Sequence, residues 1–404
     1  SINIIILIIM KNKNVYPWIV VALLWVVALL NYMDRQMLST MQEAMKVDIV
    51  ELNKAEAFGA LMAVFLWIYG FMSPIAGMIA AQIVHTRHRS LHNFIMNILA
   101  AMGVSEALYI PSALSLIADW HQGKSRSLAI GVHMTGLYVG QAIGGFGATV
   151  AAIFSWHTTF HWFGIVGMIY SVVLIFLLRE NPDRMIAEQP SSAAGKEKRP
   201  SLFGGLSMLF STWAFWIILF YFAAPSLPGW ATKNWLPTLF SESLGIPMAE
   251  AGPISTITIA FSSVVGVILG GILSDRWVQK NIRGRVYTGA IGLGLTVPAL
   301  MLLGFGSSFV AVIGAGLLFG IGFGIFDANN MPILCQFVSA KHRGTAYGIM
   351  NMTGVFAGAA VTQLLGKWTD GGSLGEGFAM LSIIVLIALA LQLYFLRPKT
   401  DNME

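Results

Sequence analysis

An acid and a base stand side by side at the end of an apolar run. Asp34 and Arg35 lie in the stretch LLNYMDRQML, and the residues from Trp18 to Leu30 carry no charged or amide side chain. A charge inside a membrane helix costs at least about 2.5–3.5 kcal/mol, so it usually faces a cavity and serves a function. Because neighbouring helical residues diverge by roughly 100°, we expect Asp34 and Arg35 to have separate partners.

Proton transfer and anion binding are the chemistry that these side chains suit. Two carboxylates near one cavity share a proton and titrate as a coupled pair, which predicts a proton site formed by Asp34 and Glu106. Arg35 would bind a ligand carboxylate, because a guanidinium stays charged and holds planar anions through two hydrogen bonds. The alternative for Asp34 and Arg35 is a bridge to other helices, or exposure at the helix end.

Other polar side chains in apolar stretches would complete a site for a hydroxyl-bearing anion. Lys233 follows Pro225, Pro228 and Gly229, which predict a helix break beside a cavity. It would add a second cation, or it is a lysine at a gate. For each amide, the alternative is an interhelical hydrogen bond worth about 0.6 kcal/mol. The remaining predicted ligand-binding residues are Tyr69, His133, Tyr138, Gln141, Asn234, Asp327, Asn329, Asn330 and Asn351.

The elements that position these residues must be membrane helices. The chain has 404 residues, 56% of them hydrophobic and 11% charged, whereas soluble domains carry about 25% charged residues. The single cysteine, Cys335, excludes an internal disulfide and a thiol metal site. No glycine-rich phosphate loop follows a strand pattern. We therefore expect no enzyme, no cofactor, no metal and no nucleic-acid partner.

Hydropathy and Pro/Gly punctuation predict eleven spans, with the sixth of them broken in the middle. They are placed at 16–38, 56–80, 100–118, 127–152, 160–178, 206–225 continuing as 230–240, 250–274, 286–306, 308–337, 345–366 and 374–396. The segment between Ala80 and Ala101 is too short and basic to hold both a loop and a full span. One helix is therefore poorly represented there.

The distribution of basic residues predicts twelve spans with both termini in the cytoplasm. With twelve, all but five of the 24 Lys and Arg residues face one side, as the positive-inside rule requires. With eleven, every loop after the second helix would change sides. The five exceptions are Arg35, Lys46, Lys54, Lys233 and Lys367.

The chain divides into two similar halves joined by a polar linker. We expect an N-terminal extension at 1–15, a bundle at 16–180, a cytoplasmic linker at 181–202, a second bundle at 203–397 and a tail at 398–404. RSLAIGVHMTGLYVG from Arg126 parallels RGTAYGIMNMTGVFAG from Arg343. Duplicated bundles of this kind place a ligand site at their interface, near the middle of the membrane.

NYMDRQ, MGVSEALYIPSALSLIADWH and GGILSDRWVQKNIRGR resemble the major facilitator superfamily along essentially the whole chain. The resemblance implies an all-α polytopic membrane protein with the major facilitator fold, two six-helix bundles that alternate access by rocking. It also implies that Gly271, Asp275, Arg276 and Arg283 belong to a signature loop that latches helices. The matching loop of the first half departs from the pattern, with Ala81 where the acid belongs, and Leu99 replaces a frequent arginine.

Within that superfamily, the motifs are similar to the anion:cation symporter branch, which imports sugar acids with protons. That branch uses a helix 1 Asp-Arg pair and a helix 4 glutamate, matching Asp34, Arg35 and Glu106. The motifs also resemble the Spinster-like branch, which exports amphiphiles. We expect a monomeric, proton-coupled symporter of a small organic anion in the cytoplasmic membrane. The alternatives are a lysolipid exporter, a sugar-phosphate antiporter and a transporter-like sensor.

Overall fold

The computed structural model describes residues 15–83, 109–110, 113–114, 116–117, 120–121, 126–178, 209–211, 213–338 and 343–398. All regular elements in these ranges are helices. The first half contributes α2 (Tyr16–Thr40), α3 (Gln42–Met45), η1 (Val50–Asn53), α4 (Ala55–Ile83), α7 (Arg126–Gly144), α8 (Gly147–Phe154) and α9 (Trp156–Leu177). The second half contributes α12 (Trp213–Leu244), α13 (Met248–Val278), α14 (Gly284–Phe305), α15 (Phe309–Phe337), α16 (Arg343–Asp370) and α17 (Leu374–Phe395).

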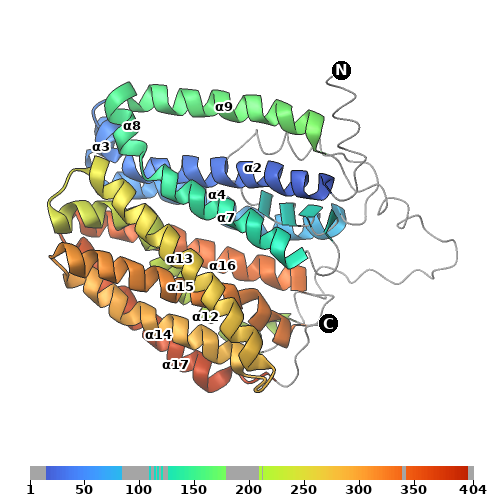
Figure 1. Ribbon diagram of the computed structural model, residues 1–404. Coiled ribbons are helices and arrows are strands. Elements are labelled where there is room, and N and C mark those ends of the chain that lie inside the picture. Colours follow the sequence, from blue (N-terminus) through green and yellow to red (C-terminus); the bar gives the residue numbers. More distant parts are fainter. Residues whose placement is uncertain are drawn as a thin grey trace.

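The helices form two layers, one from each half of the chain (Figure 1). Nine of the described helices are long and apolar enough to span a membrane, and the α7–α8 pair adds a tenth if it is one bent span. The third predicted span, and all of the fourth except short helical pieces between 109 and 120, lie outside the described residues. The linker 181–202 lies outside them as well.

The span predicted at 206–225 and 230–240, the seventh when the poorly represented helix is counted, is one continuous helix. The break expected near residues 225–230 is therefore wrong. α12 contains Pro225, Pro228 and Pro237 in its interior. A proline removes only its own N–H and the bond to the carbonyl four residues earlier. Interrupting the helix would expose more backbone groups where no water can satisfy them, so the helix continues.

The fifth predicted span is not straight, contrary to the continuous helix expected at 127–152. Ala129–Gly144 and Gly147–Phe154 meet at a bend of 48°. Gly145, in the turn between them, packs against the other bundle: a Cβ there would lie 1.9 Å from the Thr256 hydroxyl and 2.8 Å from the Gly252 carbonyl oxygen. The bend therefore occurs where glycine lets α13 approach the backbone.

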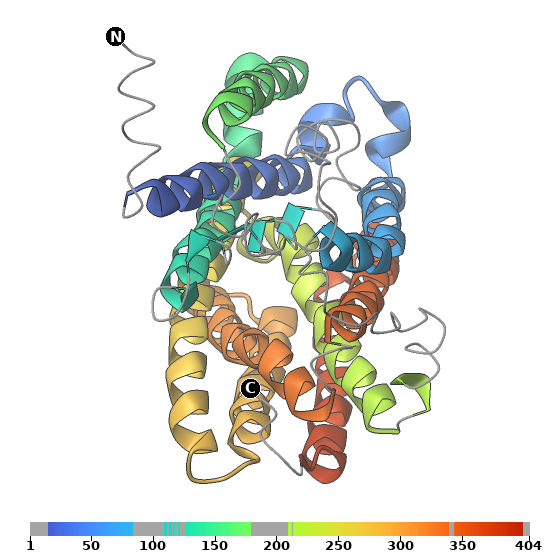
Figure 2. The same ribbon diagram turned by 90° about the vertical axis from the view of Figure 1, so that its right-hand side faces the viewer.

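Among the described helices, the bundles meet mainly where α4 packs on α16, where α7 and α8 pack on α13, and where α2 packs on α12. Figure 2 looks onto the end of the molecule that carries both termini and shows α4 beside α16, with α7 beside α13 on the other flank. The described hydrogen bonds across the interface lie from its middle to the opposite end, which carries Thr40, Ala55 and Asp370. We call that opposite end the closed end.

Candidate functional site

Two cations from opposite bundles meet on one indole. The guanidinium carbon of Arg35, on α2, lies 4.0 Å from the ring centroid of Trp230, on α12. The ammonium nitrogen of Lys233, one turn further along α12, lies 4.5 Å from the same centroid. The charges are therefore at most 8.5 Å apart, the sum of 4.0 and 4.5 Å. Arg35 also lies 5.2 Å from the ring of Phe65, on α4.

Such a pair of like charges needs compensation. At 8.5 Å and an effective dielectric constant of 20, their repulsion is about 2 kcal/mol, and it grows at shorter separation. Each cation–indole contact contributes about 0.5–2 kcal/mol of stabilisation, which offsets this repulsion. The carboxylate of Asp327, on α15, also lies in electrostatic range of Lys233. The site thus concentrates positive charge and would hold an anion between the bundles.

A hydrogen bond beside the cations joins the bundles directly. The Gln36 side-chain nitrogen donates to the backbone carbonyl of Lys233 at 2.8 Å. That carbonyl lacks its helical donor, because residue 237, four positions later, is a proline without an N–H. Gln36 therefore satisfies a backbone acceptor that the sequence of α12 leaves open. The same bond sets how α2 lies along α12.

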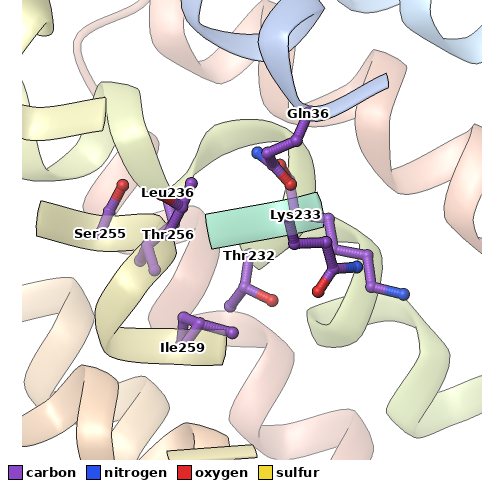
Figure 3. A pocket seen from close by; sticks show the side chains of 8 residues that line it. Gln36, Thr232, Lys233, Leu236, Ser255, Thr256 and Ile259 are labelled. Carbon is purple, nitrogen blue, oxygen red and sulfur yellow. The ribbon is translucent and has the colours of Figure 1, made fainter. Parts of the chain in front are cut away.

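A small polar pocket opens next to this bond (Figure 3). Figure 3 shows Gln36 reaching from α2 toward the turn of α12 that carries Thr232 and Lys233, with Ser255 and Thr256 on the neighbouring helix. The pocket has room for about one water molecule, and the amide and hydroxyl groups of its wall can donate and accept hydrogen bonds. The lining residues are Gln36, Gln141, Thr232, Lys233, Leu236, Ser255, Thr256 and Ile259.

Asp34 is half-buried in α2, one residue before the arginine. Within the described part of the chain it forms no hydrogen bond and no ion pair. Arg35 has its aromatic partners on α4 and α12, so the two neighbours do have different surroundings. Glu106, the expected partner of Asp34 in the proton site, lies outside the described residues.

A second cross-bundle hydrogen bond joins Tyr69 and Asn351. The Asn351 amide, on α16, donates to the Tyr69 hydroxyl, on α4, at 3.2 Å. The Tyr69 ring stacks on Phe65 at 6.3 Å between centroids, and Phe65 is the second ring beside Arg35. Aromatic contacts therefore connect this hydrogen bond to the cation pair.

Asp327 forms the opposite wall of the site. It lies within a membrane-spanning helix, yet its side chain is exposed. The Asn330 amide donates to its carboxylate at 3.1 Å, and Tyr138 of α7 is in electrostatic range. Since Lys233 and Tyr138 come from different bundles, Asp327 faces the space between them. Tyr138 and Gln141 are thus the α7 residues of the predicted set that reach this space.

Three predicted ligand-binding residues have packing partners away from the cations. His133 is fully buried within the first bundle, 3.5 Å from the Tyr109 hydroxyl. The Asn234 amide donates to the Thr362 hydroxyl at 2.8 Å, and the Asn329 amide donates to the carbonyl of Ile325 in its own helix at 2.8 Å. His133 and Asn234 therefore have the contacts of residues that hold helices together, whereas Asn329 bonds within its own helix.

The predicted signature loop joins α13, α14 and α17. Arg285, which was not in the predicted set, lies 3.4 Å from the Asp275 carboxylate. Arg283 donates to the carbonyl of Leu393 in α17 and lies over Tyr287. Arg276 is in the last turn of α13, where a cation favours the helix dipole. A Cβ on Gly271 would meet nothing within 4 Å.

Trp230 and Gln36 are among the residues of the site that sequence reasoning missed. Each had a local signal: Trp230 precedes Lys233 by three positions, which puts both on one helix face, and Gln36 follows Arg35 directly. Their roles depend on which helix lies opposite. Neither the indole shared with Arg35 nor the bond to the Lys233 carbonyl follows from one helix alone.

Comparison with known proteins identifies the family to which this architecture belongs. Residues 90–362 and 282–403 match the model of the Major Facilitator Superfamily. The hexuronate transporter of Bacillus subtilis is 24% identical over 421 residues, covering 96% of each chain. A rice protein named "Probable anion transporter 3, chloroplastic" is 25% identical over 390 residues, covering 86% of this chain and 74% of its own.

Solved structures match the fold as well. The bacterial homologue of the human lysosomal transporter Spinster, in its inward-facing and unoccupied conformation, superposes with a TM-score of 0.66. The two are 17% identical, and the match covers 93% of this chain and 96% of that one. With helices in two bundles, a polar site between them and a family match over most of its length, this chain belongs to the Major Facilitator Superfamily of membrane transporters.

Proposed function

We propose that the protein is a proton-coupled symporter of a small organic anion, a sugar acid such as a hexuronate or an aldonate. The observation that carries the proposal is the meeting of Arg35 and Lys233 on Trp230. Each bundle supplies one cation, so an anion between them interacts with both halves. Alternating access requires a ligand site of this kind at the bundle interface.

The polar groups around the cations favour a polyhydroxylated anion. Arg35 would bind the carboxylate through two hydrogen bonds. The side-chain oxygens of Gln36 and Thr232 and the amide of Gln141 line the neighbouring pocket and offer hydrogen bonds to hydroxyl groups. Tyr69 and Asn351 offer a further pair on the other side of Phe65. The names of relatives as hexuronate and anion transporters point to the same ligand class.

Asp34 is the group that we assign to the proton. A half-buried carboxylate that lacks a partner in the described structure is best accommodated when it can take up a proton. Glu106 would share that proton, as the sequence predicts. The proton is then the coupling ion, and the proposed transport needs no cofactor.

The positive-inside pattern orients the proposed cycle. The pattern predicts that both termini lie in the cytoplasm and the closed end outside, in a cell's cytoplasmic membrane. Lys46, Lys54 and Lys367 belong to the closed end, and two of them have acidic neighbours: Glu43 for Lys46 and Glu56 for Lys367. In the proposed cycle the transporter acts as a monomer, and the structure described is sealed on the outer side.

The test is uptake of labelled D-glucuronate and D-gluconate by proteoliposomes, with and without an inward proton gradient. We expect accumulation above equilibrium only with the gradient. Asp34→Asn should abolish this accumulation while preserving exchange of internal for external substrate, and Asp34→Glu should retain part of it. Gradient-driven accumulation by Asp34→Asn would remove Asp34 from coupling. Movement of lysolipid without uptake of either acid would favour the amphiphile exporter instead.

A further inference from the structure

We infer that Trp230 is a positioning residue, which holds Arg35 and Lys233 at a spacing that one carboxylate can bridge. The inference rests on the proposed function, because it identifies how the anion site is assembled. The two charges are at most 8.5 Å apart. A carboxylate with N–O contacts of about 2.7–2.9 Å to both cations spans up to about 8 Å between the charge centres.

The place of the indole is fixed by its own bundle. Trp230 is 9% exposed, and it packs against α16 at a glycine. A Cβ on Gly358 would lie 2.2 Å from the indole Cδ1 and 2.4 Å from Cγ. No side chain larger than hydrogen fits there without moving the ring. Gly358 therefore allows Trp230 to lie close to α16 while the ring remains in contact with both cations.

Lys233 reaches the indole through helix geometry. Residues three apart on a helix lie on the same face, and the ammonium of Lys233 is 4.5 Å from the ring centroid. This contact is contained within α12. It persists whenever α12 is intact, whatever the position of the other bundle.

Arg35 reaches the indole only because the bundles are together. Gln36, the next residue of α2, donates to the carbonyl of Lys233, and this bond fixes the position of α2 along α12. Arg35 then lies over Trp230. When the bundles separate at the closed end, α2 leaves α12 and this contact is lost. Trp230 thus completes the two-cation site in the conformation that is closed at this end.

Tryptophan suits this position because its ring must attract the two cations, Arg35 and Lys233. The indole has the strongest cation-attracting face among the aromatic side chains. A leucine would keep the apolar contact and lose this attraction, so the repulsion between the two cations would be less compensated. Binding of an anion should then depend on the electron density of the ring and not only on its size.

The experiment replaces Trp230 by tryptophans bearing one to four fluorine atoms, which withdraw electrons from the ring with little change of shape. D-glucuronate uptake by proteoliposomes gives KM and the maximal rate. We expect KM to rise with each fluorine, and to rise about tenfold in Trp230→Leu, with a smaller change in maximal rate. Trp230→Phe should fall between. The control is Trp216→Leu, on the same helix, where the side chain is 49% exposed and bonds to the Phe210 carbonyl.

Two results would overturn the inference. A KM that is constant across the fluorinated series would show that the ring serves only to fill space. A fall in maximal rate at constant KM, shared by Trp230→Leu and Gly358→Ala, would show a purely structural role. Gly358→Ala should instead raise KM, because the added methyl group displaces the indole.

A second measurement requires no substrate and separates this inference from the proposed function. Spin labels would be placed at Val47 and Val310, which are 78% and 81% exposed at the closed end of the two bundles, after Cys335→Ser. Without ligand, Trp230→Leu should lengthen the label distance by releasing Arg35 from α12. If the label distance lengthens in Trp230→Leu but the wild-type protein does not transport glucuronate, the sugar-acid proposal fails and the positioning role stands. Unchanged distances would refute the cross-bundle contact of Trp230.

Discussion

The α4–α16 and α2–α12 contacts join the same two bundles in different ways. The α4–α16 contact is extensive and mostly apolar, with Phe58 packed on Trp235 and Trp67 on Phe356. The α2–α12 contact is small and polar, and consists mainly of Arg35 on Trp230 and one amide–carbonyl bond. One contact aligns the bundles, and the other contains the charges that an anion would bind.

The difference suggests how ligand and conformation are connected. Apolar contacts are insensitive to the charge of a ligand, whereas the α2–α12 contact is made of the proposed binding groups themselves. An anion that bridges Arg35 and Lys233 would strengthen this contact and favour the closed end. A ligand can shift an equilibrium only by its differential affinity for the two states, and this is the contact where that difference arises.

The largest effect should come from removing charge at the α2–α12 contact. Arg35→Ala deletes the only cation that the described part of α2 supplies, and loss of a buried charged partner costs about 2–5 kcal/mol. We expect KM for D-glucuronate to rise at least about 30-fold. Uptake rates across a range of substrate concentrations provide the measurement.

Lys233→Ala is the matched comparison for that variant. It removes the ammonium but keeps the backbone carbonyl that accepts the Gln36 bond. A lysine is a point charge without the bidentate geometry of arginine, so we expect a smaller rise in KM, about tenfold. A larger loss for Lys233→Ala than for Arg35→Ala would reverse the proposed roles.

An intermediate effect should follow from crowding the α4–α16 contact. A Cβ on Gly366 would lie 2.6 Å from the carbonyl oxygen of Ala55 and 3.0 Å from the Cα of Glu56. Gly366→Val must push the helices apart, at a cost of about 1–3 kcal/mol. We expect spin-label distances at the closed end to lengthen and the maximal uptake rate to fall, with KM changed less than in Arg35→Ala.

Gly294→Val is the control for crowding, because a Cβ there would meet nothing within 4 Å. It should leave both the label distances and the uptake rate unchanged. If Gly366→Val behaved like Gly294→Val, close approach of α4 and α16 would not be needed for the cycle.

The smallest effect should come from a helix cap that crosses the interface. The Asp370 carboxylate, at the end of α16, accepts hydrogen bonds from the backbone N–H groups of Ala55 and Glu56 at 2.8 and 2.9 Å. Losing a cap costs about 1 kcal/mol. Asp370→Ala should therefore lower the ratio of closed to open conformations about fivefold, as measured by spin-label distances.

Asp370→Asn refines this prediction, since its amide oxygen still accepts one of the two bonds. It should give about half of the free-energy change of Asp370→Ala. Equal populations in the wild type and in Asp370→Ala would mean that the cap follows closure without favouring it.

The fold was largely predictable, because apolar length and basic-residue placement are properties of the chain itself. The predicted spans at 250–274, 286–306, 308–337 and 374–396 correspond to α13, α14, α15 and α17. The errors occurred at Pro225, Pro228 and Gly145, where the local backbone preference of the residue competes with the effect of its surroundings. The prolines do not break α12, because lipid penalises an open backbone, and Gly145 bends its span where α13 packs against it.

The site was predictable only in part. Arg35 and Lys233 are identifiable as charges within apolar runs, and this property does not depend on neighbours. Whether an amide binds a ligand or another helix does depend on them: Asn351 meets Tyr69 across the interface, while Asn234 bonds to Thr362 within its own bundle. Helical periodicity cannot distinguish an amide that binds a ligand from one that bonds to another helix, because Asn351 and Asn234 are both polar residues in otherwise apolar helices.

The sequence by itself determined that this is a helical membrane protein of two similar halves with charges inside it. Those conclusions follow from the cost of placing polar groups in lipid, which each residue carries wherever it lies. Only the tertiary structure decided that Arg35 and Lys233 share Trp230, and that Gln36 takes the carbonyl that Pro237 leaves open. The contacts of Arg35 and Gln36 with α12 join residues about 200 positions apart, so they exist only once the two bundles have packed together.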